Sequence, residues 1–130
     1  MALEGLQNVV KDRATVTATI VSEGVAIAYN GGLAATNAVA VKGVSTHKAA
    51  INDVIDIVKL GMPTRLRITL GQVIAVGDPL GIGATAGQFS KITRGAGGGI
   101  LAWSRGVTTG SGEEYVEADF CNLGFLDAVS

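Results

Sequence analysis

The chain has 130 residues, a length typical of one domain that buries most of its apolar surface without metals or disulfides. Charged residues make up 16% and the formal net charge is -1, so the clustered basic excess that nucleic-acid binding requires is absent. The single cysteine, Cys121, excludes an internal disulfide framework, and no metal-ligand spacing surrounds it. Because 48% of the residues are apolar, we expect protein partners to cover part of the surface.

The first residues are expected to form an arm (1–13), followed by a single β-rich domain (14–130). Four apolar side chains of the arm recur at helix-like spacing but are too few for a stable isolated helix: Leu3, Leu6, Val9 and Val10. They therefore need a partner to cover them. The basic residues Lys11 and Arg13 follow these apolar residues, which is unlike a signal peptide, and no window of about 18 apolar residues indicates a spanning helix. We expect synthesis and folding in a cytoplasm.

Alternating β-branched and small residues predict strands along the whole chain. The expected strands, in chain order, are 15–21, 24–29, 38–44, 53–60, 64–70, 72–76, 88–93, 99–104 and 114–120. A break is expected at Gly61-Met62-Pro63. Helix is expected only near residues 45–53, which a loop explains equally well, and in a turn near residues 3–10. Short strands with glycine turns are typical of an all-β barrel or sandwich.

The segment TRLRITL, residues 64–70, has the cleanest alternation. Leu66, Ile68 and Leu70 are expected to face the core, and Arg65 and Arg67 to face outward. Paired guanidinium groups on one strand face can hold an acidic partner, although a solubilising outer face is the simpler interpretation. Trp103 in GILAWSRG is either a core residue or an anchor for subunit contacts.

The glycine-dense stretch from Gly71 to Ile92 does not match a phosphate site. A P-loop needs a lysine and a hydroxyl residue after its last glycine, whereas Gly87 is followed by Gln88 and Phe89. A dinucleotide loop needs a helix at that point, and QFSKITR is β-like. We expect a hairpin turn at 81–87 that binds no ligand and no cofactor.

Acid-base chemistry has few candidate residues in this sequence. His47 is the only histidine, and its neighbours do not by themselves form a spatial triad, so it is expected to be a solvated loop residue. Glu113 and Glu114 are adjacent, and adjacent strand residues point to opposite faces. We expect both carboxylates to face solvent, and we assign no catalytic residue.

Three segments of the sequence match the pattern of a known protein family. VIAVGDPL at 73–80 carries a G-D-P-L core, GILA at 99–102 matches a later strand, and DVIDIVKLG at 53–61 matches a strand followed by glycine. With these segments the sequence resembles the phage head decoration or capsid cement proteins. The resemblance covers about the last two-thirds of the chain. Trp103 departs from it, because an aliphatic or small residue is expected there.

This resemblance implies a small β-barrel or β-tulip-like fold with little helix. It also implies a homotrimer on the exterior of a phage capsid that clamps subunits of the major capsid protein, with no enzymatic activity, membrane partner or small-molecule substrate. The arm residues Leu3, Leu6, Val9 and Val10 are then the expected capsid contacts. The expected subunit interface contains Trp103, Arg65 and Arg67.

Two other classes of function remain open from the sequence. A swinging-arm carrier domain of the biotinyl or lipoyl kind also uses a V-x-x-G-D-x-L element, but HKAA around Lys48 lacks the expected flanking Met or Asp. A trimeric β-fold nucleotide hydrolase needs an Asp-bearing motif, which DVIDIV at 53–58 matches only weakly.

Overall fold

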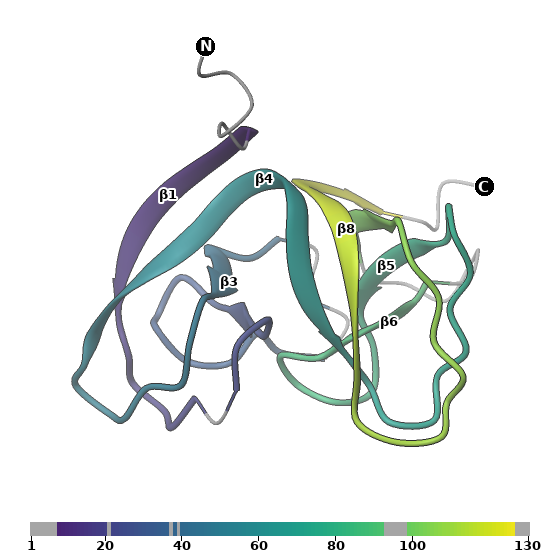
Figure 1. Ribbon diagram of the computed structural model, residues 1–130. Coiled ribbons are helices and arrows are strands. Elements are labelled where there is room, and N and C mark those ends of the chain that lie inside the picture. The colour runs from purple at the N-terminus through teal and green to yellow at the C-terminus, as the bar shows by residue number, and fades with distance from the viewer. Residues whose placement is uncertain (1–7, 21, 37, 39, 93–98, 127–130) are drawn as a thin grey trace, which may run out of the picture.

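The computed structural model describes residues 8–20, 22–36, 38, 40–92 and 99–126, which contain eight strands and no helix (Figure 1). The strands are β1 (Asn8–Thr15), β2 (Ala26–Ile27), β3 (Gly43–Ser45), β4 (Val54–Ile68), β5 (Pro79–Ile82), β6 (Phe89–Lys91), β7 (Gly99–Ser104) and β8 (Glu114–Leu126). The predicted all-β class is confirmed. Within this described part, no helix is long and apolar enough to cross a membrane.

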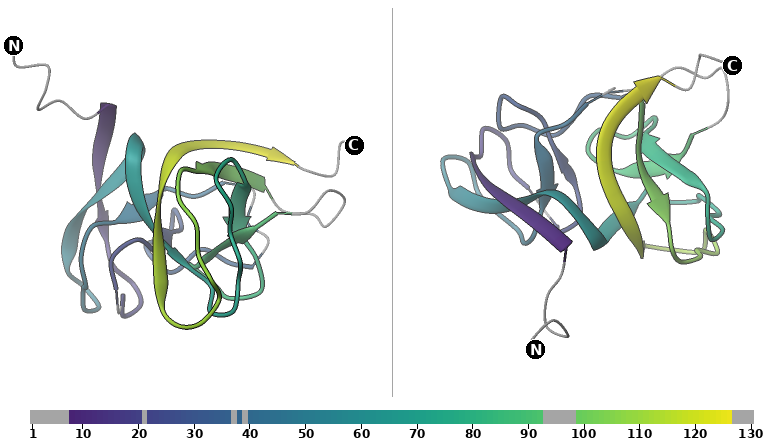
Figure 2. Two further views of the ribbon diagram at one scale, coloured as in Figure 1. Left: turned by 45° about the vertical axis from the view of Figure 1, so that its right-hand side comes forward. Right: turned by 90° about the horizontal axis from the view of Figure 1, so that it is seen from above.

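Five of the strands close into a ring. β4 pairs with β8, which pairs with β7, then β5, β6 and back to β4. The pairings are antiparallel except the one that closes the ring, where Ile68 of β4 lies parallel to Phe89 of β6. β1 and β3 pair with the first half of β4 instead, and β2 pairs with β3. Seen from above, β4 therefore lies between β1 and β8 (Figure 2).

The apolar side chains form two clusters, and β4 contributes to both. Ile55 and Ile57 pack with Ala14, Val16, Ile20, Val25 and Ile27 beside β1. Leu66 and Ile68 pack in the ring, where Phe89 and Phe120 meet edge to face with ring centroids 6.2 Å apart. The inward positions predicted for Leu66 and Ile68 are confirmed, but Leu70 follows the end of β4 and is exposed.

The predicted break at Gly61-Met62-Pro63 is wrong, because β4 runs through it as one strand of 15 residues. What changes there is the partner: Gly61 pairs with Val9 of β1 and Phe120 of β8, and from Thr64 onward the pairing with β8 continues after a shift in register. A proline has no N–H to donate, so Pro63 is tolerated where the ladder is irregular. β4 thus arches from one cluster to the other (Figure 1).

The first predicted strand, 15–21, is also wrong. The strand lies earlier, at Asn8–Thr15, because it is defined by antiparallel pairing with residues 54–62 of β4. Beyond it, Ile20 makes only an isolated bridge with Ala49. Residues 8–13, which the sequence analysis assigned to the arm, are therefore hydrogen-bonded to β4 of their own chain.

Other predicted elements are shorter than expected or absent. Residues 72–76 form no strand, and among the described residues of 38–44 only Gly43 and Val44 do. Residues 46–53, which follow Ser45 at the end of β3, form a loop with a turn at Ile51 and Asn52 rather than a helix. The strand expected at 99–104 is confirmed as β7.

Candidate interaction surface

Arg65 and Arg67 lie side by side on the outward face of β4, as predicted. In the pairing with β8 they stand opposite Glu117 and Tyr115, while the intervening Leu66 and Val116 are buried. Directly opposed residues of an antiparallel pair point to the same face of the sheet. Glu117 and Tyr115 of β8 therefore face outward together with Arg65 and Arg67 of β4.

Arg65 is held by an aromatic ring and a carboxylate of its own chain. Its guanidinium carbon lies 4.3 Å from the centre of the Tyr115 ring, within the range of a cation–π contact. Its Nη1 atom is 3.7 Å from Glu23 Oε1, and both side chains remain about half exposed. An exposed ion pair of this length contributes little stability.

Arg67 is fixed more firmly than Arg65. Its Nη1 atom is 2.8 Å from Glu113 Oε2 and donates to Ser22 Oγ at 3.2 Å, and the side chain is only 18% exposed. The Nε atom is buried with no hydrogen-bond partner among the described residues. Arg67 thus connects the start of β8 to the turn at residues 22–24. A partner could contact only the small exposed part of its side chain.

Trp103 extends the same face onto β7. It stands opposite Asp119 of β8 and Pro79 of β5 and is 43% exposed, which excludes the core position that the sequence left open. The neighbouring Arg105 Nε lies 3.5 Å from Asp119 Oδ1. The three predicted interface residues therefore share one surface, which we call the outer sheet face: Arg65, Arg67, Tyr115, Glu117, Asp119 and Trp103.

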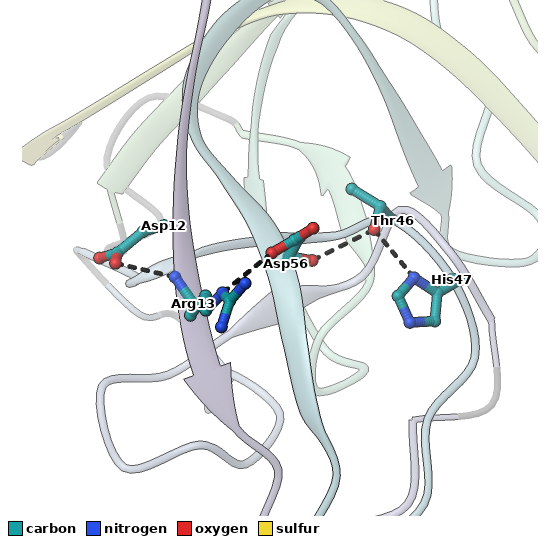
Figure 3. A network of polar contacts seen from close by, with 5 residues as sticks. All are labelled: Asp12, Arg13, Thr46, His47 and Asp56. Carbon is teal, nitrogen blue, oxygen red and sulfur yellow. Dashed lines mark hydrogen bonds and ion pairs between the residues drawn. The ribbon is translucent and has the colours of Figure 1, made fainter.

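An open hollow of about 460 Å³ lies beside Tyr115. Its lining is polar and comes from three parts of the chain: Ser22 and Glu23, Thr46 to Lys48, and Glu113 with Tyr115. His47 is exposed, as predicted, and its Nδ1 atom lies 3.0 Å from Thr46 Oγ1, which in turn donates to the carbonyl oxygen of Asp56 (Figure 3). No group of three metal-binding side chains occurs among the residues described.

Glu113 and Glu114 have different roles. Glu113 is exposed and pairs with Arg67. Glu114 is half-buried, and its carboxylate accepts hydrogen bonds from the backbone of Thr109 at 3.0 Å and of Gly110 at 2.7 Å. The hydrogen bond from the Thr109 backbone is the largest cause of a lowered pKa at Glu114. The expectation that both glutamates merely face solvent is therefore wrong for Glu114.

The expected capsid contacts fall only partly on described residues. Leu3 and Leu6 lie outside them, and Val9 and Val10 are in β1. Val10 stands directly opposite Leu60 of β4, and these two apolar side chains are 50% and 42% exposed. Closer to the end of β1, Arg13 Nε is 3.5 Å from Asp56 Oδ1 (Figure 3).

The glycine-dense stretch forms the hairpin expected from its sequence. β5 and β6 pair antiparallel with Ile82 opposite Phe89, and the turn between them contains Gly87 at a φ of 76°. Gly81 lies inside β5, and a Cβ atom there would meet the Gly99 carbonyl oxygen. Lys48, the residue that a carrier domain would have to modify, is exposed in the loop that joins β3 to β4.

Four exposed apolar side chains outside the sheet were missed by the sequence analysis. Leu70, Val73, Val76 and Val107 are 66% to 68% exposed in the connections before β5 and after β7. The signal was present in GQVIAVG, an apolar run bounded by two glycines, but it was interpreted as a strand.

Comparisons with known proteins give a similar fold but no family. No protein-family model and no curated protein matches the sequence. Among solved structures, the fold is similar to one described as the crystal structure of head fiber gp8.5 N base in bacteriophage phi29, with a TM-score of 0.62 and 14% sequence identity. The similarity covers 88% of this chain and 95% of that chain. At this identity, the two chains share a fold.

Proposed function

We propose that this chain is a structural protein of a bacteriophage virion. It binds the exterior of the capsid as a homotrimer, bridges subunits of the major capsid protein, and has no catalytic role. The observation that carries this proposal is the fold shared with a phage head-fibre base over 88% of the chain. The resemblance of residues 73–80 and 99–102 to capsid decoration proteins was found independently, in the sequence.

The composition of the outer sheet face supports self-association. Arginine, tyrosine and tryptophan are the residue types most enriched among interface hot spots, and this face gathers Arg65, Tyr115 and Trp103. A closed trimer uses one pair of surfaces three times, so each contact contributes three times to one assembly.

The projecting end of β1 is the proposed capsid contact. The opposed pair Val10 and Leu60 offers an exposed apolar spot at that end of β1, and the other expected contacts, Leu3, Leu6 and Val9, precede Val10 in the sequence. β1 pairs only with β4 in the described part of the chain, which leaves its outer edge available for an added strand. Three such contacts per trimer bind a shell far more tightly than one.

The test is co-sedimentation with shells assembled from the major capsid protein of the same genome. The wild-type chain is expected to pellet with the shells and to saturate them at a fixed ratio. Val10→Asp combined with Leu60→Asp is expected to weaken binding at least tenfold, because both aspartates would have to be desolvated at the contact. Substitution is preferable to deletion of residues 1–13, since residues 8–13 belong to β1.

Val54→Asp is the matched control, because Val54 lies at the other end of the same strand pair, opposite Thr15, and is 61% exposed. It should bind shells like the wild type. A wild-type protein that remains in the supernatant at every concentration contradicts the proposed function. Equal losses in the Val54 variant and the double variant contradict the assignment to the Val10 end of β1.

A further inference from the structure

The connections before β5 and after β7 lie side by side and form a ribbon of two irregular segments, which we define as residues 70–78 and 104–110. The two segments run side by side on the right of Figure 1, joined by hydrogen bonds from Gly77 N to Ser104 O at 2.8 Å and from Thr108 N to Ile74 O at 3.0 Å. The buried hydroxyl of Thr108 also accepts from Ile74 N and donates to Gln72 O. These bonds hold the ribbon in one conformation.

The ribbon exposes four aliphatic side chains to solvent. Ile74 and Thr108 point inward and are buried, whereas Val73, Val76 and Val107 are about two-thirds exposed, as is Leu70 at the base. Exposed apolar surface on soluble proteins marks binding sites when it extends beyond single residues, and these side chains come from two segments that are hydrogen-bonded to each other. Because the ribbon is already ordered, covering it requires little additional loss of conformational entropy.

The charged side chains of the ribbon form ion pairs within the chain, and this limits the kind of partner that the ribbon can bind. Arg105 pairs with Asp119, and Asp78 pairs with Lys91 at 3.7 Å and accepts a hydrogen bond from Ala75 N. No unbalanced charge is therefore presented to a nucleic acid or an anionic membrane. The chemistry that matches this surface is another neutral, apolar protein surface.

The ribbon follows the outer sheet face directly along the chain. From Trp103 onward the exposed positions alternate along the chain, through Arg105 and Val107 to Thr109. A stable interface usually involves about 20 to 30 residues on each side, so four aliphatic side chains are too few to form one alone. The ribbon can therefore form a stable interface only together with the adjoining outer sheet face.

We propose that the ribbon and Trp103 together contact a second copy of this chain, an inference that rests on the homotrimer of the proposed function. In this arrangement Val73, Val107 and Trp103 are the apolar centre of the contact. Arg65 and Arg67 lie at its margin, because they are already engaged with Glu23 and Glu113.

Analytical ultracentrifugation of the isolated chain, without shells, tests this inference. The wild type is expected to self-associate as its concentration rises. Val73→Asp combined with Val107→Asp is expected to weaken the association constant at least tenfold, and Val54→Asp to leave it unchanged. All three positions are exposed, and circular dichroism with thermal unfolding checks that each variant remains folded.

Three results would overturn the inference: a wild type that stays monomeric at every concentration, a double variant that associates normally, or a Val54 variant that is impaired to the same degree. Shell binding is measured separately. A chain that self-associates through the ribbon but does not bind shells would refute capsid attachment and leave the ribbon contact standing.

Discussion

Glu114 is the residue whose pKa is most clearly affected by its surroundings, because its carboxylate accepts backbone hydrogen bonds. It closes the 109–114 loop by accepting backbone hydrogen bonds from Thr109 and Gly110, and these bonds favour the charged form. Its pKa is consequently lowered from the ordinary value of 4.5, chiefly by the Thr109 backbone N–H. The loop joins the ribbon to β8, so its order affects the ribbon and the adjoining outer sheet face.

Glu114→Gln is expected to lower the free energy of unfolding at pH 7, since the neutral amide accepts hydrogen bonds more weakly than the carboxylate. A depressed folded-state pKa adds stability that is fully present above the unfolded value and is lost as the pH falls through the folded value. The difference from wild type should therefore shrink below pH 4.5. Urea unfolding across this pH range measures it.

Glu117→Gln is the control for Glu114→Gln, because it removes one negative charge from the same strand and leaves the 109–114 loop unchanged. A Glu114 variant whose deficit is the same at pH 3 and pH 7 would show that the charge of this carboxylate has no role in the loop.

Outward-facing residues of the sheet could be predicted from the sequence, but their partners could not. Alternation alone placed Arg65 and Arg67 outside and Leu66 inside, because a strand has a period of two. The partners Glu23 and Glu113 come from turns about 40 residues away on either side, and local periodicity contains no information on such contacts.

At the scale of elements, the second half of β4 was predicted well because one of its faces is buried and the other exposed, and β7 was predicted with its observed bounds although most of its residues are buried. The errors occurred where pairing rather than composition defines the strand. β1 carries Lys11, Asp12 and Arg13 in its middle and resembles a charged loop, yet it pairs with β4 over its whole length. The run QVIAV has strand composition but lies outside the eight strands described.

Substitutions at three glycines test whether the turn of the β5–β6 hairpin needs its glycine. Gly87→Ala is expected to lower the free energy of unfolding the most, because φ is +76° and the new Cβ would lie 2.9 Å from Leu33 Cδ2. Gly77→Ala has the same kind of backbone, with φ at +89°, but open space around it, and should cost about 1 kcal/mol. Gly112→Ala has neither constraint and should be neutral.

Equilibrium unfolding in urea gives the order of these three variants. If Gly87→Ala and Gly112→Ala are equally stable, the turn does not need its glycine, and the assigned hairpin geometry is wrong. A matching loss in Gly77→Ala and Gly87→Ala would instead show that backbone conformation alone sets the cost and that the contact with Leu33 adds nothing.

At the scale of the whole molecule, one long strand connects two apolar clusters and two proposed contact surfaces. The β1 side of β4 holds the Val10–Leu60 pair, and the β8 side holds the outer sheet face and leads to the ribbon. The sequence indicated the all-β class and the low charge from composition alone. It could not indicate which apolar residues stay exposed, because that depends on how the ring closes.

The near-neutral charge of the whole chain leads to a last prediction, on the salt dependence of self-association. The net charge is -1, and the arginines near the outer sheet face are paired within the chain, with Glu23, Glu113 and Asp119. Raising the salt concentration shortens the screening length from about 10 Å at 0.1 M to about 3 Å at 1 M, which weakens contacts between exposed charges and leaves apolar contacts intact. The association constant is therefore expected to change by less than about threefold or to increase.

Sedimentation equilibrium of the isolated chain at the two salt concentrations measures this dependence, and Arg65→Gln is the comparison variant. A tenfold fall in the association constant at high salt, abolished by Arg65→Gln, would place charged contacts at the centre of the interface. Arg65 would then lie at the centre of the interface and the ribbon at its margin. An association constant that does not fall at high salt in either protein is the outcome that an interface centred on Trp103, Val73 and Val107 requires.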